Sequence, residues 1–226
     1  MLIISSVLIF AQELFMSDGF NDTRIKSSLA DAEKYSNRKQ SKHKAEMKLI
    51  RKAMSHLSDV VSVLDAPCGI GRATIMLDNF GYDVIGIDAG DGAIKKAEEE
   101  VEKARADCQI MKEDMRHMSF RSQSFDAILC FRFFHHLSSQ QAKQQIVSEL
   151  CRVSNQYVLI SYLSPWSVTS IKRKIKAYLR IKVSVQNSTP LQELNRYFEN
   201  CGFSLDKDLA QFVFFRSLHL AIYKKT

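Results

Sequence analysis

The segment 61–77 constrains the fold most, because it predicts a strand, a tight turn and a helix in immediate succession. It opens with mostly apolar residues typical of a buried strand and closes with a helix-like run. Pro67, Gly69 and Gly71 stand between them. Such a turn presents backbone N–H groups at a helix N-terminus, and its glycines let the main chain approach a ligand closely. We therefore expect a ligand-binding turn at the end of the first strand.

Two acidic residues accompany this turn. Asp65 ends the first strand, and Asp88 ends the next strand-like run, 83–88. The carboxyl ends of neighbouring parallel strands meet at one edge of a sheet, and an acid at the end of the second strand binds ribose hydroxyls in nucleotide-binding folds. The pair predicts a ligand that contains a nucleoside.

The spacing of the turn distinguishes between kinds of nucleoside. A dinucleotide fingerprint needs a third glycine at position 74, where this chain has Thr74. Instead, Asp65 is followed by Gly69 and Gly71. This Asp-x-x-x-Gly-x-Gly arrangement resembles motif I of the class I S-adenosylmethionine-dependent methyltransferases. A nicotinamide site and a purely structural turn are the alternative interpretations.

The resemblance implies S-adenosylmethionine as the cofactor and S-adenosylhomocysteine as the product. In the family, one acid lies near the methionine end, a second binds the ribose, and a third accepts a hydrogen bond from the adenine amino group while its neighbour packs on the ring. The cofactor-binding residues so implied are Asp65, Ala66, Gly69, Gly71, Asp88, Ala89, Asp114, Met115 and Phe131. Tyr35 and Arg38 match an aromatic and a basic residue of the family's lid helices, although a solvated helix face explains them equally well.

The strand and helix patterns alternate along the chain, which predicts an α/β fold with a doubly wound, mostly parallel sheet. The resemblance implies seven strands and N-terminal lid helices. At 226 residues we expect one domain, with residues 1–58 as N-terminal segment and lid and residues 59–226 as the cofactor-binding core. Thr189 is expected to cap a helix that begins with Pro190, and three strands, 203–208, 210–215 and 218–223, are expected to close the sheet, with a hairpin around 216–217.

The segment after the fourth strand resembles that of small-molecule methyltransferases, in which a histidine pair opens the next helix. An imidazole titrates near neutral pH, so we expect His135 to face the pocket as a general base and His136 to be structural or to contact the substrate. Tyr162 and Trp166 lie where the family lines its acceptor pocket. Tyr162 is a second catalytic candidate and Trp166 a substrate contact, with core packing as the alternative for both.

The positive charge of the chain is concentrated in one segment. The formal net charge is +7, and residues 150–192 contain seven Lys and Arg but no Asp or Glu. The basic segment 172–182, which includes Lys172 and Arg173 as substrate contacts, suits a phosphorylated acceptor, an anionic membrane surface or RNA. A surface helix whose lysines extend over the core is the alternative.

These patterns predict a methyltransferase that acts on oxygen or nitrogen of a small-molecule or lipid-like, anionic acceptor. An RNA methyltransferase is the second interpretation, and a cofactor-binding accessory protein without catalysis is the third. No Asn-Pro-Pro-Tyr or Asp-Pro-Pro-Tyr run follows the fourth strand, so methylation of a base amino group is not favoured.

The five cysteines are scattered, with no Cys-x-x-Cys pair and no histidine at metal-ligand spacing. We therefore expect reduced thiols, no metal and a cytoplasmic protein, with peripheral membrane contact through the basic segment. No Lys or Arg precedes the apolar run 2–10, which is too short to span a bilayer, so residues 1–15 are interpreted as preceding a true start at Met16. Monomer and homodimer both remain open.

Overall fold

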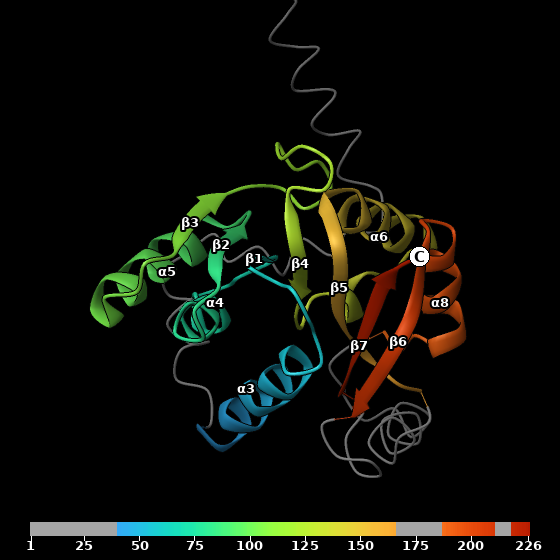
Figure 1. Cartoon of the computed structure of the whole chain (residues 1–226), viewed down its shortest axis with the longest axis horizontal. Helices are drawn as coiled ribbons and strands as arrows, with labels where there is room; N and C mark the ends of the chain where they lie inside the picture. The colour runs from blue at the N-terminus through green and yellow to red at the C-terminus, as the bar shows by residue number, and fades with distance from the viewer. Residues whose placement is uncertain (1–39, 166–186, 211–217) are drawn as a thin grey trace, which may run out of the picture.

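The computed structural model describes residues 40–165, 187–210 and 218–226. Figure 1 shows a central sheet with helices on both faces. The helices are α3 (Gln40–Met54), α4 (Arg72–Asp78), α5 (Asp91–Ala104), α6 (Gln140–Val153), α8 (Leu191–Glu199) and the short 3-10 helix η2 (Phe134–His136). The strands are β1 (Ser62–Asp65), β2 (Asp83–Asp88), β3 (Gln109–Lys112), β4 (Phe125–Cys130), β5 (Ser154–Leu163), β6 (Phe203–Ala210) and β7 (Leu218–Lys225).

The sheet has seven strands in the order β3-β2-β1-β4-β5-β7-β6. The first five of these are parallel, and β7 runs antiparallel to both β5 and β6. The predicted doubly wound, mostly parallel sheet is therefore confirmed. The direction of winding reverses between β1 and β4, and open α/β sheets bind their ligands outside the carboxyl ends of the strands at such a point.

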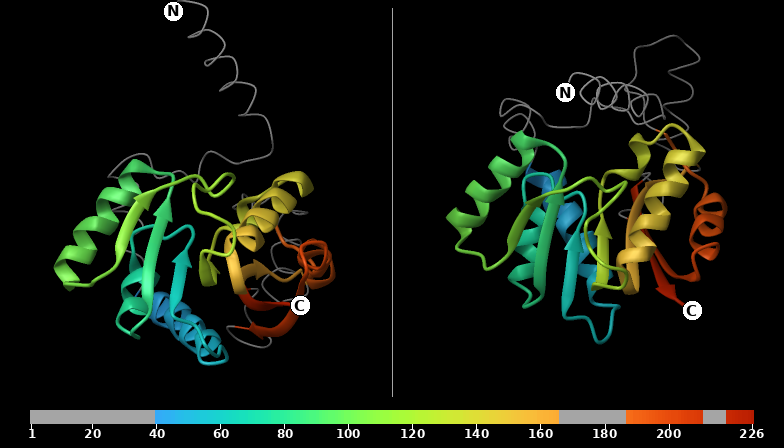
Figure 2. Two further views of the ribbon diagram at one scale, coloured as in Figure 1. Left: turned by 45° about the horizontal axis from the view of Figure 1, so that its top comes forward. Right: turned by 90° about the horizontal axis from the view of Figure 1, so that it is seen from above.

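Each central strand is apolar on both faces, because helices cover both sides of the sheet. Alternate residues of β5 contribute to two separate cores, so that Val158 and Ile160 join α6 and α8 while Tyr157 and Leu159 join α3 and α4. Figure 2 shows these helix layers on the two sides of the sheet. The buried apolar residues of α3 are Leu49, Ile50, Ala53 and Met54.

Three local predictions are corrected. The histidine pair does not open the next helix: it lies in the separate turn η2, and α6 begins after Ser139, whose hydroxyl accepts a hydrogen bond from the N–H of Ala142 at 3.0 Å. Thr189 does not cap α8, because Pro190 is the N-cap residue and makes no side-chain bond. Strand β6 continues to Ala210, so no break separates the predicted strands at Leu209.

Several predicted residues lie outside the described residues, namely Tyr35, Arg38, Trp166, Lys172, Arg173, residues 1–15 and most of the predicted strand 210–215. Among the described helices, none combines the length and the apolar character needed to cross a bilayer. Within the same residues, no cluster of His, Cys, Asp and Glu has the arrangement of a metal site.

Candidate functional site

The turn between β1 and α4 has a backbone conformation that depends on its glycines. Gly69 and Gly71 have φ angles of 62° and 77°, in the left-handed region that residues with a Cβ rarely adopt. A Cβ on Gly71 would also lie 3.4 Å from the Cβ of Ala97 on α5. The turn is fastened to the sheet because Cys68 donates its N–H to the carbonyl of Ile87 at 2.7 Å. Its glycines therefore set both the backbone path and the packing against α5.

Gly86 in β2 lets this turn lie close to the sheet. A Cβ at position 86 would stand 3.0 Å from the Cβ of Cys68, the Cδ1 of Ile110 and the Oγ1 of Thr74. Sequence reasoning missed this residue, although a glycine inside a strand is a recognised sign of close backbone approach. A side chain at this position would therefore require its neighbours in the turn and in β3 to give way by a few tenths of an ångström.

Asp65 lies beneath the turn, and it is almost fully buried, with 1 % exposure. Its Oδ2 accepts a hydrogen bond of 2.7 Å from the hydroxyl of Thr74, the residue that replaces the third glycine of a dinucleotide fingerprint. Burial raises the pKa of Asp65 to about 7, although the bonds from Thr74 act in the opposite direction. The contact of Asp65 that the structure describes is therefore internal, and its contact with the cofactor stays a prediction.

Asp88 joins the two loops that follow β1 and β2. Its Oδ2 accepts the N–H of Gly69 at 3.1 Å, and its Oδ1 accepts the N–H of Gly90 at 2.9 Å. The side chain belongs to the last residue of β2, so the carboxylate stands at the carboxyl edge of the sheet directly beside the glycine turn. Sequence spacing predicted this juxtaposition of Asp88 and the turn, and the structure brings the two together.

The predicted adenine contacts follow β3. Asp114 is half-buried, and the guanidinium of Arg116 approaches its Oδ2 to 2.8 Å and 2.5 Å through Nε and Nη2. Burial alone would raise the pKa of Asp114, but the bonds from Arg116 outweigh it and hold the pKa below its usual value. Met115 is buried in the core, with 5 % exposure. Both residues lie just beyond the end of β3, at the same edge as Asp88.

A buried ion pair connects the first described helix to this edge. The guanidinium of Arg132, which follows β4, lies 3.1 Å from the carboxylate of Glu46 on α3, and their side chains are 13 % and 4 % exposed. Arg132 also has a left-handed φ of 60°, and its N–H donates to the hydroxyl of Ser161 at 2.5 Å. The chain next to Phe131 is therefore fixed by contacts from both α3 and β5, none of which the sequence indicated.

The histidine pair lies against the segment that leads into α8. The rings of His135 and His136 have centroids 4.1 Å apart, and His135 is 1 % exposed. Asn187 donates its N–H to the carbonyl of His135 at 2.9 Å, and Thr189 donates its own to the carbonyl of Leu163 at 3.0 Å. The hydroxyl of Thr189 is buried and has no hydrogen-bond partner in the part of the chain that the structure describes. Such a group is a candidate ligand contact that sequence reasoning had assigned to a helix cap.

A cluster of three polar side chains stands where β5, β6 and β7 meet at the same edge. The hydroxyl of Tyr162 donates to the Oδ2 of Asp208 at 2.9 Å, and the Nδ1 of His219 lies 2.9 Å from the same oxygen. Burial and the neighbouring charge of Asp208 raise the pKa of Tyr162, so its hydroxyl keeps its proton at neutral pH. Tyr162 therefore orients Asp208, and Asp208 orients the imidazole of His219.

These residues fit the chemical groups of an adenosyl amino acid. The turn provides a glycine cradle that a Cβ would disturb, and Asp88 offers a carboxylate beside backbone N–H groups. Further along the same edge lie Asp114, Phe131 and the Tyr162 cluster, each just before or after the end of a different strand. The edge thus carries a carboxylate beside backbone N–H groups and, separately, the cluster of Tyr162, Asp208 and His219.

Comparisons with known proteins concern the same part of the chain. Residues 63–157 match the sequence model of a methyltransferase domain. The match covers less than half of the chain, and together with the seven-stranded sheet it indicates that residues 63–157 carry a methyltransferase domain of the class I S-adenosylmethionine-dependent type. S-adenosylmethionine is the cofactor of that family.

Among curated proteins, the chain is 29 % identical over 109 residues to a probable S-adenosylmethionine-dependent methyltransferase of Saccharomyces cerevisiae, a match that covers 46 % of this chain and 36 % of the yeast protein. It is 25 % identical over 103 residues to an uncharacterized methyltransferase of Schizosaccharomyces pombe. This second match covers 45 % of this chain and 71 % of that protein. The match therefore spans only about a third of the length of the first of these relatives.

Solved structures show the same fold. The PH0226 protein of Pyrococcus horikoshii superimposes with a TM-score of 0.68 at 18 % identity, over 84 % of this chain and 93 % of that one. Magnesium protoporphyrin IX methyltransferase of Synechocystis, solved with bound S-adenosylhomocysteine, superimposes with a TM-score of 0.64 at 15 % identity, over 81 % and 82 % of the two chains.

Proposed function

We propose that this protein transfers the methyl group of S-adenosylmethionine to oxygen or nitrogen of a small-molecule or lipid-like, anionic acceptor. The observation that carries the proposal is the bond between Asp88 and the N–H of Gly69, which unites the ribose-binding carboxylate and the glycine turn in one site. The methyl-bearing sulfonium supplies its own leaving group, and the protein's main task is therefore to hold donor and acceptor in line, which lowers a barrier by about 7 to 11 kcal/mol in well-oriented systems.

The residues of the turn would bind and orient the cofactor. Asp88 would accept hydrogen bonds from the ribose hydroxyls, and the backbone of Gly69 and Gly71 would lie against the amino acid end. Asp114 and Met115 would contact the adenine, and the backbone near Phe131 would close the site opposite the turn. Ala66 and Ala89, adjacent to the two acids, would contribute backbone contacts.

A hydroxyl or ammonium acceptor loses a proton when it is methylated, and two imidazoles near the carboxyl edge of the sheet are candidates to accept it. His135 is the residue that the sequence indicated. His219 has the support of Asp208, which holds its Nδ1 at 2.9 Å, and its side chain is 19 % exposed. We assign the proton-accepting role to His219, because an imidazole fixed by a carboxylate at one nitrogen presents the other in a defined direction.

The histidine assignment is tested by three matched substitutions. We expect His219→Gln to lower kcat by about 10² to 10⁴-fold, which is the usual contribution of an acid–base group, with the affinity for S-adenosylmethionine unchanged. His117→Gln, at an exposed histidine, is the control and should have no effect. A loss of kcat in His135→Gln but not in His219→Gln would return the role to His135.

The anionic acceptor is inferred from charge. Seven basic residues and no acidic ones lie between residues 150 and 192, and Lys172 and Arg173 are the contacts that we propose for the acceptor. Trp166 and His136 are two further contacts that we propose. An anionic membrane surface would meet the same segment if the acceptor is lipid-like.

The decisive experiment supplies methyl-labelled cofactor and a cell extract that is then separated into small-molecule, lipid, RNA and protein fractions. Label in the small-molecule or lipid fraction supports the proposal, and label in RNA would replace it with an RNA methyltransferase. Uptake of S-adenosylmethionine without release of S-adenosylhomocysteine would indicate an accessory protein.

Calorimetry tests the cofactor site separately. Asp88→Asn should weaken binding of S-adenosylhomocysteine by about 10- to 100-fold, since it removes a charged hydrogen-bond acceptor. Asp91→Asn is the matched control, because Asp91 lies three residues away with a side chain that is 72 % exposed. Equal affinities of these two variants would contradict the assignment of Asp88.

A further inference from the structure

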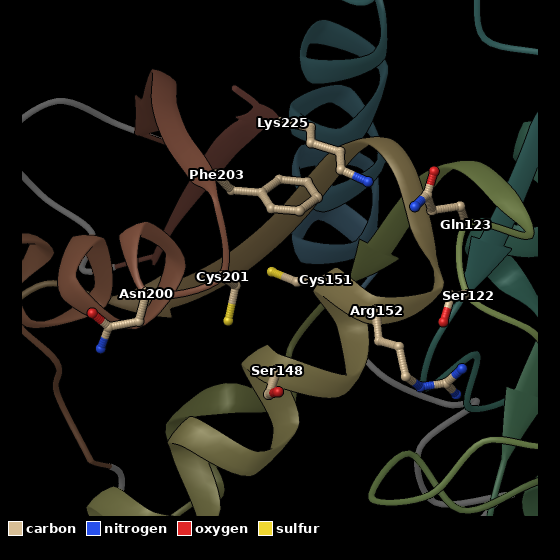
Figure 3. Close-up of a pocket in the computed structure, with 9 residues that line it drawn as sticks. All are labelled: Ser122, Gln123, Ser148, Cys151, Arg152, Asn200, Cys201, Phe203 and Lys225. Carbon is tan, nitrogen blue, oxygen red and sulfur yellow. The ribbon is translucent and has the colours of Figure 1, made fainter.

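A cavity of about 360 Å³ lies far from the proposed methyl-transfer site. It is lined by the end of α6, the turn after α8, the start of β6 and the end of β7 (Figure 3). The start of β5 and the start of β6 share one edge of the sheet, because both strands pair antiparallel to β7. The cofactor edge is formed by the opposite ends of the parallel strands, so the cavity and the glycine turn stand at opposite edges.

Two thiols meet in this cavity. Figure 3 shows the sulfur atoms of Cys151, near the end of α6, and Cys201, just after α8, next to each other. The two side chains share a hydrogen bond, and Ser148, one turn before Cys151, makes a second bond to the sulfur of Cys201. All five cysteines of the chain are reduced in the structure. Sequence reasoning missed this pair, because 50 residues separate the two cysteines.

The two thiols differ in chemical character. The bond from Cys151 and the bond from Ser148 stabilise a thiolate at Cys201 and lower its pKa to about 7. Burial, together with the bond to Cys201, raises the pKa of Cys151. Cys201 is half-buried, whereas Cys151 is 6 % exposed. A reagent entering the cavity therefore meets the more acidic thiol first.

We propose that Cys201 and Cys151 form an oxidation-sensitive pair that takes a low-molecular-weight disulfide as its substrate, with Cys201 as the attacking thiol and Cys151 as the resolving thiol. The Cys201 thiolate attacks one sulfur of the disulfide, forms a mixed disulfide and releases the first thiolate. Cys151 then gives up its proton to solvent, its sulfur attacks that of Cys201, and the second thiolate leaves. The two cysteines are oxidised together, and one disulfide is reduced to two thiols.

The cavity suits such a reagent. Its volume of about 360 Å³ leaves room for part of a reagent beside the two thiols, and Lys225 lines it with a positive charge that favours an anionic disulfide. The charge of Lys225 also opposes the rise in the pKa of Cys151. It therefore favours deprotonation of Cys151 and its attack on the sulfur of Cys201. The proposal for the cysteine pair does not depend on methyl transfer and is tested independently of it.

The experiment treats the full chain with glutathione disulfide and follows intact mass and peptide maps. The wild-type protein should lose two hydrogen atoms, with a single linkage between Cys151 and Cys201. Cys151→Ser should instead retain one glutathione on Cys201, and both Cys201→Ser and Cys201→Ala should remain unmodified, with circular dichroism confirming that they are folded. Cys108→Ser is the matched control and should behave as wild type, because Cys108 is also half-buried but burial raises its pKa to about 11.

Alkylation gives an independent measurement. At pH 7.5 iodoacetamide should modify Cys201 at least about tenfold faster than Cys108, because most of the former and little of the latter is thiolate. Equal rates, or an unchanged mass after glutathione disulfide, would overturn the proposal. A mixed disulfide that persists in the wild-type protein would overturn the resolving role of Cys151.

Discussion

Asp65 illustrates how a single buried carboxyl group connects the fold to pH. Its pKa rises from 3.8 to about 7 in the folded protein, chiefly through burial, so the folded state favours the protonated acid. Between about pH 4 and pH 7 the folded protein therefore binds more protons at this residue than the unfolded chain does. It follows that the free energy of unfolding falls as the pH rises through this window and is constant above it.

We predict that Asp65→Asn removes this dependence. A shift of about three pKa units corresponds to about 4 kcal/mol, of which about 3 kcal/mol is expected between pH 5 and pH 8. Urea unfolding of both proteins at the two pH values measures it. The difference in free energy of unfolding between the wild type and the variant should fall by about 3 kcal/mol from pH 5 to pH 8. A difference that does not change with pH would contradict a raised pKa of Asp65.

Gly86 supports a second prediction at the scale of a single residue. Gly86→Ala places a Cβ 3.0 Å from side-chain atoms of Cys68, Ile110 and Thr74, so these neighbours must give way by a few tenths of an ångström. Overpacking of this kind costs about 1 to 3 kcal/mol. We expect a loss of stability in that range and weaker binding of S-adenosylhomocysteine in calorimetry.

Gly81→Ala is the control for Gly86→Ala. Gly81 has a φ of 86°, but a Cβ there meets no atom within 4 Å, so only the backbone strain is introduced. Cofactor affinity should be unchanged in this variant. Equal losses of affinity in the two variants would show that the spacing between the turn and β2 is not what matters.

At the scale of elements, α3 is joined to the exit of β4 by the buried pair of Glu46 and Arg132. Removing one partner of a buried ion pair is expected to cost about 3 to 5 kcal/mol, because the other charge remains in the interior. Glu46→Gln should therefore lower stability by about this amount, as measured by chemical unfolding. Replacing both residues by Met should restore much of it.

The exposed pair of Asp91 and Lys112 provides the comparison. Their side chains are 72 % and 58 % exposed, and ion pairs of this kind contribute little to stability. Asp91→Asn should leave the unfolding midpoint nearly unchanged. If Glu46→Gln were as mild as Asp91→Asn, α3 would not depend on Glu46 for its attachment.

Local patterns in the sequence predicted the elements and the first half of the site. Apolar runs located the parallel strands, and they placed Asp65 and Asp88 at the ends of β1 and β2, where parallel strands end at one edge. The roles of the two acids toward the cofactor came from the resemblance to the family and stay predictions. Contacts across distant elements escaped this reasoning. Tyr162, Asp208 and His219 meet only because β7 pairs antiparallel between β5 and β6, and no local periodicity encodes that meeting. Thr189 was misassigned because its sequence context matches a capping box, while the structure begins α8 after Pro190.

For the whole molecule, the distribution of charge distinguishes the segment that we propose for the acceptor from the turn that we propose for the cofactor. Outside residues 150–192, basic and acidic residues are equal in number, so the entire net charge of +7 belongs to that segment. The cofactor turn is formed by residues that precede it. Changes to the segment should therefore affect the acceptor and leave the cofactor site unaltered.

We predict that the double variant Lys172→Gln and Arg173→Gln raises KM for an anionic acceptor by about 30-fold, because each basic residue near an anionic surface contributes about 1 kcal/mol and the two together contribute about 2 kcal/mol. Steady-state kinetics with the acceptor found by the labelling experiment measures this, while kcat and the affinity for S-adenosylmethionine should not change. The control carries the same loss of charge at Lys95 and Lys103, both exposed on α5, and should behave as wild type. Added salt should weaken acceptor binding by the wild type more than by the double variant, since screening acts on charges that the variant lacks. Equal sensitivity to salt in the two proteins would show that the basic segment does not contact the acceptor.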